Sequence, residues 1–282
     1  MIRLEHVAKS FGGNPVLRDV TFDINDGESV VLIGRSGQGK SVTLRNILGL
    51  IQPDKGKVWV DEEDVTEMTP EELREMRKKV GMLFQNAALW DSMSVFENIA
   101  LALRHHTNMT EKTIEGIVYE SLKQVGLHDP DRKGQSAEDV AKRMPSDLSG
   151  GMRKRVGLAR AIATRPKYML YDEPTTGLDP IMSGIIDNLI RELNEANNTT
   201  SLTITHDMRS AFTIADRIVV LHRGEIIFDA PKKVAQTLKD MNRADVETEK
   251  EQVVHQLLNG DHEGLVHPAI RDHYEKAHVH QA

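Results

Sequence analysis

The stretch of sequence that decides the fold is Gly34-Arg-Ser-Gly-Gln-Gly-Lys40-Ser41. It fits the pattern of a phosphate-binding loop, in which a glycine and four further residues precede Gly-Lys-Ser. Glycines let the backbone wrap so closely that its N–H groups point at phosphate oxygens, and the helix that follows adds the partial positive charge of its N-terminus. The pattern predicts that Lys40 neutralises the terminal phosphates of a nucleotide and that the Ser41 hydroxyl binds Mg²⁺. The predicted nucleotide-binding residues of this loop are Gly34, Arg35, Ser36, Gly37, Gln38, Gly39, Lys40 and Ser41.

The segments on either side of this loop have the patterns of a strand and a helix. Residues 29–33 form a short β-branched apolar run, and after Ser41 apolar residues recur at helical spacing as far as Ile51. Further along the chain, three short apolar runs alternate with helical stretches, which is typical of parallel strands joined by crossover helices. These runs are residues 167–171, 201–205 and 217–221. The sequence therefore predicts an α/β fold around the loop.

Other strands are predicted outside this parallel set. Residues 2–7 and 20–24 alternate apolar and polar side chains, and Gly12-Gly13-Asn14-Pro15 separates them as a turn would. We expect these two segments to pair as antiparallel strands. Residues 225–229 read as one strand of a late hairpin.

Two helical regions follow the loop. Thr69-Pro70-Glu71-Glu72 is a capping box with proline at the first helical position, and the apolar residues Leu73, Met76 and Val80 continue the helical stripe. Between about residues 95 and 160 the pattern is mostly helical, with candidate helices at 95–104 and 110–124. We expect this region to form a helical subdomain inserted in the α/β chain.

Composition limits the class of protein. The chain has 282 residues, a formal charge of −7, 39% hydrophobic residues and no cysteine. The lack of cysteine excludes disulfides and thiolate metal sites and suits the cytoplasm. No apolar run approaches the roughly 18 residues that cross a bilayer, so we expect a partner to supply any membrane role. The acidic balance argues against nucleic acid as a partner.

A second motif, Tyr168-Met-Leu-Tyr-Asp172-Glu173, is an apolar strand that ends in two carboxylates. Adjacent side chains diverge, so one acid can help to hold Mg²⁺ while the other orients and deprotonates a water molecule that attacks the γ-phosphate. The alternative is a strand end that simply meets solvent. Together with the phosphate-binding loop, the motif predicts that Asp172 binds the metal and that Glu173 is the catalytic base.

A third motif, Leu148-Ser149-Gly150-Gly151-Met152, precedes a helical stretch that ends at Pro166. Its serine and glycine N–H groups at a helix start form another anion site. Two such sites but a single phosphate-binding loop suggest that two chains share each nucleotide. With this motif between the other two, the sequence resembles the ATP-binding-cassette (ABC) ATPases over about residues 1–240.

The resemblance implies an ABC ATPase of the P-loop NTPase class. It has an antiparallel β subdomain, a RecA-like parallel-sheet core, an inserted helical subdomain and, here, a C-terminal extension at 242–282 after a domain at 1–241. It also implies that ATP and Mg²⁺ are the cofactors and that two copies pack head to tail, so that Ser149, Gly150 and Gly151 act on the partner's ATP. The further site residues that the family's motifs match are Phe11 on adenine, Gln85 as sensor of γ-phosphate and Mg²⁺, Asp179 of Gly177-Leu178-Asp179 between subunits, and His206 on γ-phosphate.

Two residues depart from the general family pattern. Phe11 replaces a tyrosine, which keeps ring stacking and loses a hydroxyl, and Met152 replaces the glutamine that ends the signature. Because the phosphate contacts come from the serine and from backbone N–H groups, we expect ATP use to be retained.

The spacing of the motifs narrows the resemblance further. From Lys40 to Ser149 is 149 minus 40, or 109 residues, which leaves no room for the long coiled coils of chromosome-organising members, and a single set of motifs argues against translation-associated members. The finer resemblance is to the ATPases of lipid-asymmetry (Mla-type) phospholipid transporters. It rests on residues 82–99, 103–107 and 144–152, including Met152.

That branch implies particular partners. They are a second copy of the chain, a membrane permease, a mammalian-cell-entry (MCE) lipid-binding protein and a small cytoplasmic regulatory subunit, at the cytoplasmic face of the inner membrane. The alternatives are the ATPase of an amino-acid or other small-solute importer and a regulatory subunit that hardly hydrolyses ATP.

Two further regions carry open interpretations. Leu89, Trp90 and Phe96 follow the predicted sensor Gln85 and are candidates to contact the permease, or else to pack between subdomains. In the extension, the apolar residues of 253–258 recur at helical spacing. They are candidates to lie across the opposite subunit, or to form a frayed surface helix.

Overall fold

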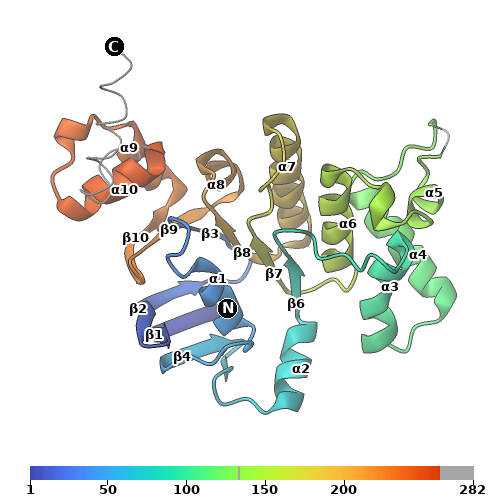
Figure 1. Ribbon diagram of the computed structural model, residues 1–282, viewed down its shortest axis with the longest axis horizontal. Coiled ribbons are helices and arrows are strands. Elements are labelled where there is room, and N and C mark those ends of the chain that lie inside the picture. Colours follow the sequence, from blue (N-terminus) through green and yellow to red (C-terminus); the bar gives the residue numbers. More distant parts are fainter. Residues whose placement is uncertain (133, 261–282) are drawn as a thin grey trace.

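The computed structural model describes residues 1–132 and 134–260. Their strands form a ten-stranded sheet in the order β5-β4-β1-β2-β10-β9-β3-β8-β7-β6 (Figure 1). The strands are β1 (Ile2–Phe11), β2 (Asn14–Ile24), β3 (Ser29–Ile33), β4 (Lys55–Val60), β5 (Glu63–Asp64), β6 (Val80–Leu83), β7 (Tyr168–Asp172), β8 (Thr200–Thr205), β9 (Arg217–His222) and β10 (Glu225–Pro231). The predicted α/β fold is confirmed.

The parallel part of the sheet is made of β6, β7, β8, β3 and β9. Every residue of β3 and β8 is buried. This burial on both faces is why these segments read as continuous apolar or small-residue runs rather than alternating ones. The phosphate-binding loop follows β3, which lies between β9 and β8, so the strand before the loop is paired on both sides.

The antiparallel part is made of β1, β2, β4 and β5, and the predicted pairing is confirmed by Ile2 opposite Ile24. The hairpin strand β10 pairs antiparallel with β9 and touches β2 at one residue pair, Glu225 and Asp19, which joins the two parts. The sequence reading missed β4, β5 and β6.

The described helices are α1 (Lys40–Ile47), α2 (Pro70–Lys78), α3 (Val95–His106), α4 (Glu111–Gln124), α5 (Ala137–Ala141), α6 (Gly150–Ile162), α7 (Pro180–Asn197), α8 (Met208–Ile214), α9 (Lys232–Asp240) and α10 (Glu249–Asn259), with short 3₁₀ turns at 145–147 and 243–245. The predicted capping box at Thr69 is confirmed. None of the helices in the described ranges is long and apolar enough to span a bilayer.

Two predicted helices end earlier than expected. Val80 was expected on the helix that starts at Pro70, but α2 ends at Lys78 and Val80 begins β6, opposite Tyr168. The β-branched side chain suits the sheet better than the helix. The helix after Ser41 ends at Ile47 rather than Ile51, because Gly49 takes a positive φ of 60° and stops it.

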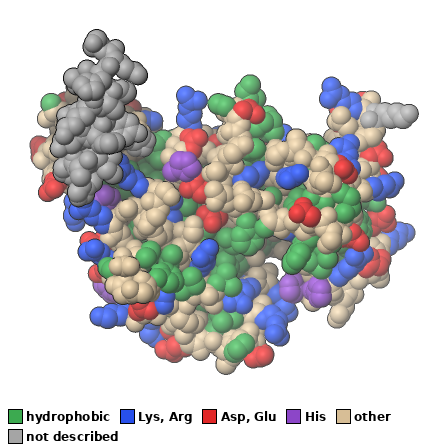
Figure 2. Space-filling view, viewed as in Figure 1, with side chains coloured by type: hydrophobic (Ala, Val, Ile, Leu, Met, Phe, Trp, Pro, Cys, Tyr) green, Lys and Arg blue, Asp and Glu red, His purple; other side chains and the backbone are tan. Residues whose placement is uncertain are grey.

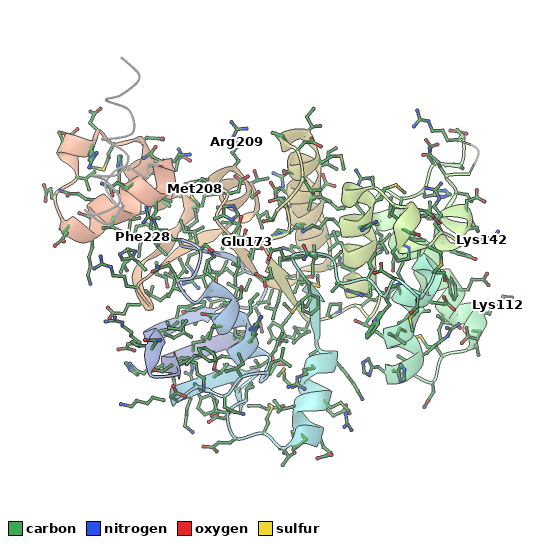
Figure 3. All side chains as sticks on the ribbon, viewed as in Figure 1. Lys112, Lys142, Glu173, Met208, Arg209 and Phe228 are labelled. Carbon is green, nitrogen blue, oxygen red and sulfur yellow. The ribbon has the colours of Figure 1, made fainter. Side chains whose placement is uncertain are left out.

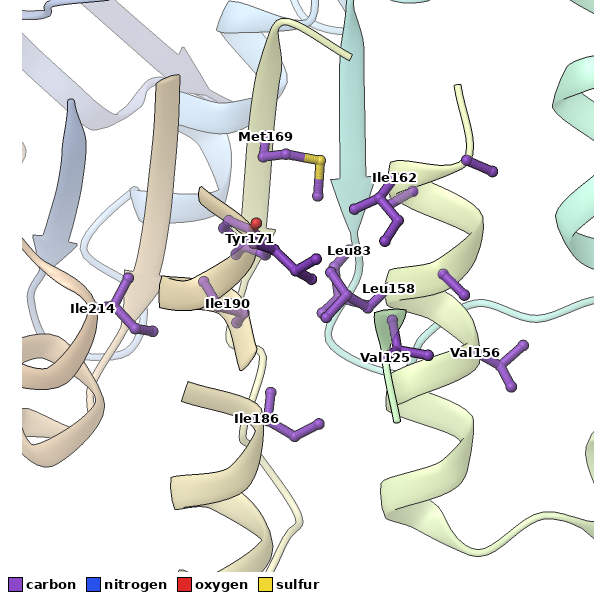
Figure 4. Packing of buried hydrophobic residues seen from close by; sticks show 14 of the residues in the cluster. Leu83, Val125, Val156, Leu158, Ile162, Met169, Tyr171, Ile186, Ile190 and Ile214 are labelled. Carbon is purple, nitrogen blue, oxygen red and sulfur yellow. The ribbon is translucent and has the colours of Figure 1, made fainter. Parts of the chain in front are cut away.

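Helices α3 to α6 stand together at one end of the molecule, and α9 and α10 lie at the other (Figure 1). Figure 4 shows how the helical group meets the sheet: Leu158 and Ile162 of α6 lie beside Leu83 of β6 and Met169 of β7. The inserted helices thus share one hydrophobic core with the sheet. Because α6 packs directly on β6 and β7 through this core, its position relative to these two strands is fixed.

The apolar group of the extension is helical, as expected, but it packs within this chain. Val254 and Leu258 of α10 are buried in the same core cluster as Ala235 and Leu238 of α9. Within this chain Val254 and Leu258 are therefore covered, and contact of the extension with an opposite subunit stays a prediction. The rest of the predicted extension, 261–282, lies outside the described residues.

Candidate active site

Close backbone packing shapes the phosphate-binding loop. A Cβ on Gly34 would lie 2.4 Å from the carbonyl oxygen of Leu221, and one on Gly39 would lie 2.5 Å from Cδ2 of Leu17. Gly39 also has a φ of +104° and is the residue before α1. Only glycine fits these two positions, so these residues allow the loop to turn sharply into α1.

Lys40 lies deep in the loop, with its side chain 7% exposed. Its Nζ donates to the carbonyl oxygens of Gly34 at 2.7 Å and Arg35 at 3.2 Å, and it lies 3.7 Å from Oε1 of Glu173. Burial lowers the pKa of Lys40, while the charges of Glu173 and Asp172 oppose that shift. The ammonium is thus held at the centre of the loop by backbone oxygens and one carboxylate.

Asp172 and Glu173 lie at the end of β7, beside the loop. The hydroxyl of Ser41 donates to Oδ1 of Asp172 at 3.3 Å. Burial raises the pKa of the Asp172 carboxyl, and the neighbouring Glu173 charge adds to the shift. Two oxygen-bearing side chains from distant segments therefore meet, as a hard divalent cation requires.

Glu173 has an unusual backbone. Its φ is +51°, and its N–H donates to the carbonyl oxygen of Ile204 on β8 at 2.9 Å. Its Oε2 lies 2.7 Å from Nδ1 of His206, which follows β8. Glu173 appears near the middle of the molecule in Figure 3, at the edge where β7 ends. The left-handed conformation turns its carboxylate toward both Lys40 and His206.

Lys40, Glu173 and His206 line a cavity of about 950 Å³, while Asp172 lies behind Ser41 and is not part of its wall. The predicted site residues on its wall are Gly34, Arg35, Ser36, Gly37, Gly39, Lys40, Ser41, Gln85, Glu173 and His206. Gln38 is tied to the far side of the loop, where its Oε1 accepts a hydrogen bond from the N–H of Arg223. The sequence did not predict that part of the cavity wall comes from the C-terminal region. This part is formed by Lys239 of α9 and by residues 257–260 at the end of α10.

Phe11 ends β1 and is 44% exposed, with Nζ of Lys9 5.7 Å from its ring centroid. It does not line the cavity itself. Its open ring face is free to stack on a planar group at the rim.

The second glycine-containing helix start lies elsewhere. Ser149 caps α6, where its Oγ accepts from the N–H of Met152 at 3.3 Å, and Ser149 and Gly150 are exposed. Asp179 caps α7 in the same way and accepts from two N–H groups at 3.0 Å. The structure does not bring Ser149, Gly150, Gly151 or Asp179 into the cavity of this chain.

The three candidates for permease contact differ in exposure. Trp90 is 58% exposed, whereas Leu89 and Phe96 pack against the core of the helical group. Leu89 and Phe96 thus pack within this chain, Trp90 is the most exposed of the three, and contact with a permease stays a prediction for all of them.

A buried lysine escaped the sequence reading. Lys154 of α6 is 5% exposed, and its Nζ donates to the carbonyl oxygens of Gln85 and Glu173. The available signal was its spacing: it lies on the same helical stripe as Gly151 and Leu158, which are both buried.

Comparisons with known proteins agree with this geometry. The family model for "ABC transporter" matches residues 17–176. The chain is 39% identical over 259 residues to the "Probable ribonucleotide transport ATP-binding protein mkl" of Mycobacterium leprae, covering 92% of this chain and 69% of that one. It is 34% identical to the "Intermembrane phospholipid transport system ATP-binding protein MlaF" of Haemophilus influenzae, covering 94% of this chain and 93% of that one. Against other mycobacterial mkl proteins it spans 66% of their length, just under two-thirds.

One solved structure has a similar fold over most of this chain. It is the dimeric ATP-binding cassette MJ0796 in a post-hydrolysis state with ADP and Pi, with a TM-score of 0.73 and 32% identity, covering 82% of this chain and 99% of that one.

Proposed function

This chain belongs to the ABC transporter family and is an ATPase whose hydrolysis of ATP is coupled to transport; on that premise we propose that it energises phospholipid transport. The single observation that carries the catalytic part of this proposal is the cluster of Lys40, Glu173 and His206 at the phosphate-binding loop. In this cluster the Lys40 ammonium, which would neutralise phosphate charge, lies beside the Glu173 carboxylate, and His206 orients that carboxylate.

In this proposal Glu173 is the general base. Its carboxylate accepts the proton of the water that attacks the γ-phosphate, while His206 holds Oε2 by a 2.7 Å contact and contacts the γ-phosphate. Lys40 leaves its carbonyl partners to neutralise charge on the phosphate oxygens. Phe11 stacks on adenine from the rim, and the loop residues 34–41 bind the phosphates.

Mg²⁺ fits the oxygen atoms at this edge. Ser41 and Asp172 would hold it, with Gln85, which also lines the cavity, as the sensor of its presence. Bound there, the ion would supply charge stabilisation to the phosphate oxygens.

A second copy completes the site in this proposal. Ser149, Gly150 and Gly151 offer a helix N-terminus that no phosphate of their own chain's cavity can reach, and Asp179 lies at the start of the next helix. The dimeric form of the similar cassette supports a head-to-tail pair. ATP would close the pair, and hydrolysis with phosphate release would reopen it.

The transport branch follows from similarity. The MlaF protein aligns over nearly its whole length, which supports a phospholipid cargo and the partners that this branch implies: a permease, an MCE-domain protein and a small regulatory subunit. The ATPase unit would be 1–241 and the extension 242–282, at the cytoplasmic face of the inner membrane. No nucleic acid is expected to bind, and on the face shown in Figure 2 basic and acidic side chains are interspersed rather than segregated.

The experiment is affinity purification of the chain from its native membrane, with identification of the proteins and lipid that accompany it and a measurement of ATP turnover. Recovery of a permease, an MCE-domain protein and phospholipid supports the proposal. A solute-binding protein with a different permease would keep the ATPase and overturn the cargo in favour of a small-solute importer. Partners recovered with no measurable turnover would favour a regulatory subunit.

A further inference from the structure

Lys154 touches two predicted site residues through their backbone. It lies on α6 with its side chain 5% exposed, and its Nζ donates to the carbonyl oxygen of Gln85 and, at 3.3 Å, to that of Glu173. An ammonium group carries three donors and no acceptor, so a buried one is retained only where oxygens receive it. Here both oxygens belong to the two sides of the γ-phosphate pocket.

The hydrogen bond from Lys154 to Glu173 helps to hold a residue with a strained backbone. Glu173 has a φ of +51°, in the left-handed region that a side chain other than glycine rarely adopts. Its N–H donates to the carbonyl oxygen of Ile204 on β8, and its carbonyl oxygen accepts from Lys154 Nζ and from the N–H of Thr176, both at 3.3 Å. Lys154 is thus the side chain among the groups that hold this backbone in its left-handed conformation.

The Gln85 contact is one of several that fasten α6 to the segment after β6. Two residues of that segment, Ala87 and Ala88, have positive φ, and their carbonyl oxygens accept from Arg160 at 2.6 and 2.7 Å. Gly157 lets the helix approach, because a Cβ there would lie 3.0 Å from Ala87 Cβ. We therefore expect the segment 85–88 to move together with α6. Figure 4 shows α6 packed beside β6, the strand that precedes this segment.

The far end of the same helix is its exposed cap. Ser149 lies five residues before Lys154, so about 7 Å of rigid helix separates them. We propose that Lys154 is a positioning residue that couples contact of the Ser149 end with the second copy's ATP to the placement of Glu173 and Gln85 around the first. This inference rests on the proposed function. The charges of Glu173 and Asp172 support an ammonium at this place, although burial lowers the pKa of Lys154 to about 8.

The test uses the full chain and three substitutions, Lys154→Met, Lys154→Gln and Lys154→Arg. Arg155→Met is the matched control, since Arg155 is the next cation on the helix and donates to Gly126, away from the cavity. Steady-state turnover against ATP concentration gives kcat, KM and the Hill coefficient, and calorimetry with ATP gives Kd. We expect Lys154→Met to lower kcat at least tenfold and the Hill coefficient toward 1, with Kd within about twofold, and Lys154→Arg to restore part of kcat.

The contrary results are distinct. A kcat within twofold of wild type for Lys154→Met overturns the inference, as does a parallel loss of kcat, ATP affinity and thermal midpoint in all three Lys154 variants, which is the mark of a packing role alone. If Lys154→Met does not fold, Lys154→Gln, which keeps two N–H donors, decides by the same criteria. An inactive wild-type chain would instead overturn the proposed function.

Discussion

Two helix starts in this molecule carry glycines and offer N–H groups, yet they are built differently. The start of α1 lies inside a cavity, with Lys40 buried and bonded to Gly34 and Arg35 and with Glu173 at 3.7 Å. The start of α6 is exposed at Ser149, which bonds only to its own helix among the contacts described.

The difference lies in what surrounds each anion site. Around α1 the chain supplies the cation, both carboxylates and the histidine, which together form one half of the proposed ATP site. Around the start of α6 the described part of the chain supplies a capped helix N-terminus and none of these four groups. A site whose second half is displayed outward needs another chain, which is the physical basis for the proposed head-to-tail pair.

The largest expected effect comes from breaking the complete half. Glu173→Gln removes the base but keeps the size of the side chain, so turnover should fall by about 10² to 10⁴. ATP should then hold two copies together, because closure is retained and hydrolysis is lost. Phosphate release at saturating ATP and gel filtration with ATP measure the two effects. Lys40→Ala is the contrast, since it should weaken ATP binding itself and give no ATP-held dimer.

The exposed half gives the next effect. Ser149→Ala removes a hydrogen bond to a charged group, worth about 1.5–3 kcal/mol, so turnover should fall roughly 10- to 100-fold, while ATP binding by the isolated chain is unchanged. Mixing this variant with Lys40→Ala sharpens the comparison. In a head-to-tail pair about half of the dimers are mixed and each keeps one intact site, so activity should rise above that of either variant alone. No recovery on mixing would contradict the shared site.

Next to the second half, α7 buries an acid whose effect depends on pH. Asp187 is 3% exposed, Ser210 donates to its Oδ2 at 2.8 Å, and its Oδ1 has no partner in the described part of the chain. Burial raises its pKa from 3.8 to about 6. The folded state thus binds a proton on Asp187 more tightly than the unfolded state does. The ionised carboxylate lowers the stability of the folded state fully above about pH 6, and this loss disappears as pH falls toward 3.8.

Asp187→Asn should therefore stabilise the chain at pH 8 by up to about 3 kcal/mol, from a shift of roughly two pKa units, and should give little advantage near pH 4. Urea unfolding of both forms at several pH values measures the difference. An equal gain at all pH values would show that the carboxylate charge is not responsible.

The smallest effect on ATP hydrolysis is expected from Trp90→Ala, because Trp90 lies outside the cavity and away from the start of α6. The backbone N–H and carbonyl of Trp90 are held by Asn98, at 2.8 and 3.1 Å, so Trp90→Ala should leave the loop in place. Basal turnover should stay within about twofold, as for other exposed positions, while phospholipid transport in the reconstituted complex falls. Equal losses of both would assign Trp90 to packing.

Much of the site was predictable because its signals are local. The loop from Gly34 to Ser41 needs glycines at fixed offsets, and Asp172 and Glu173 stand at the end of a buried apolar strand. The extents of α2 and α1 were less predictable, since Val80 continues a helical stripe and yet pairs with Tyr168 in the sheet. Tertiary pairing overrode the local pattern there.

Lys154 and the extension show what local patterns do not contain. Spacing along α6 puts Lys154 on the buried stripe of the helix, but only the fold brings the carbonyl oxygens of Gln85 and Glu173 to its ammonium group. Likewise, an apolar stripe at Val254 and Leu258 predicts a helix but not the surface that it covers, and α9 and β10 of the same chain are that surface.

By itself the sequence determined the strand-loop-helix that binds phosphate, the acidic strand end and the second helix cap, because each depends on neighbouring residues and backbone conformation. The tertiary structure alone shows that Lys40, Glu173 and His206 meet, that the start of α6 is exposed, and that Lys154 of α6 donates to the carbonyl oxygen of Glu173. Those outcomes depend on strand order and on which charges become buried beside which oxygens, and such contacts join residues far apart in the chain.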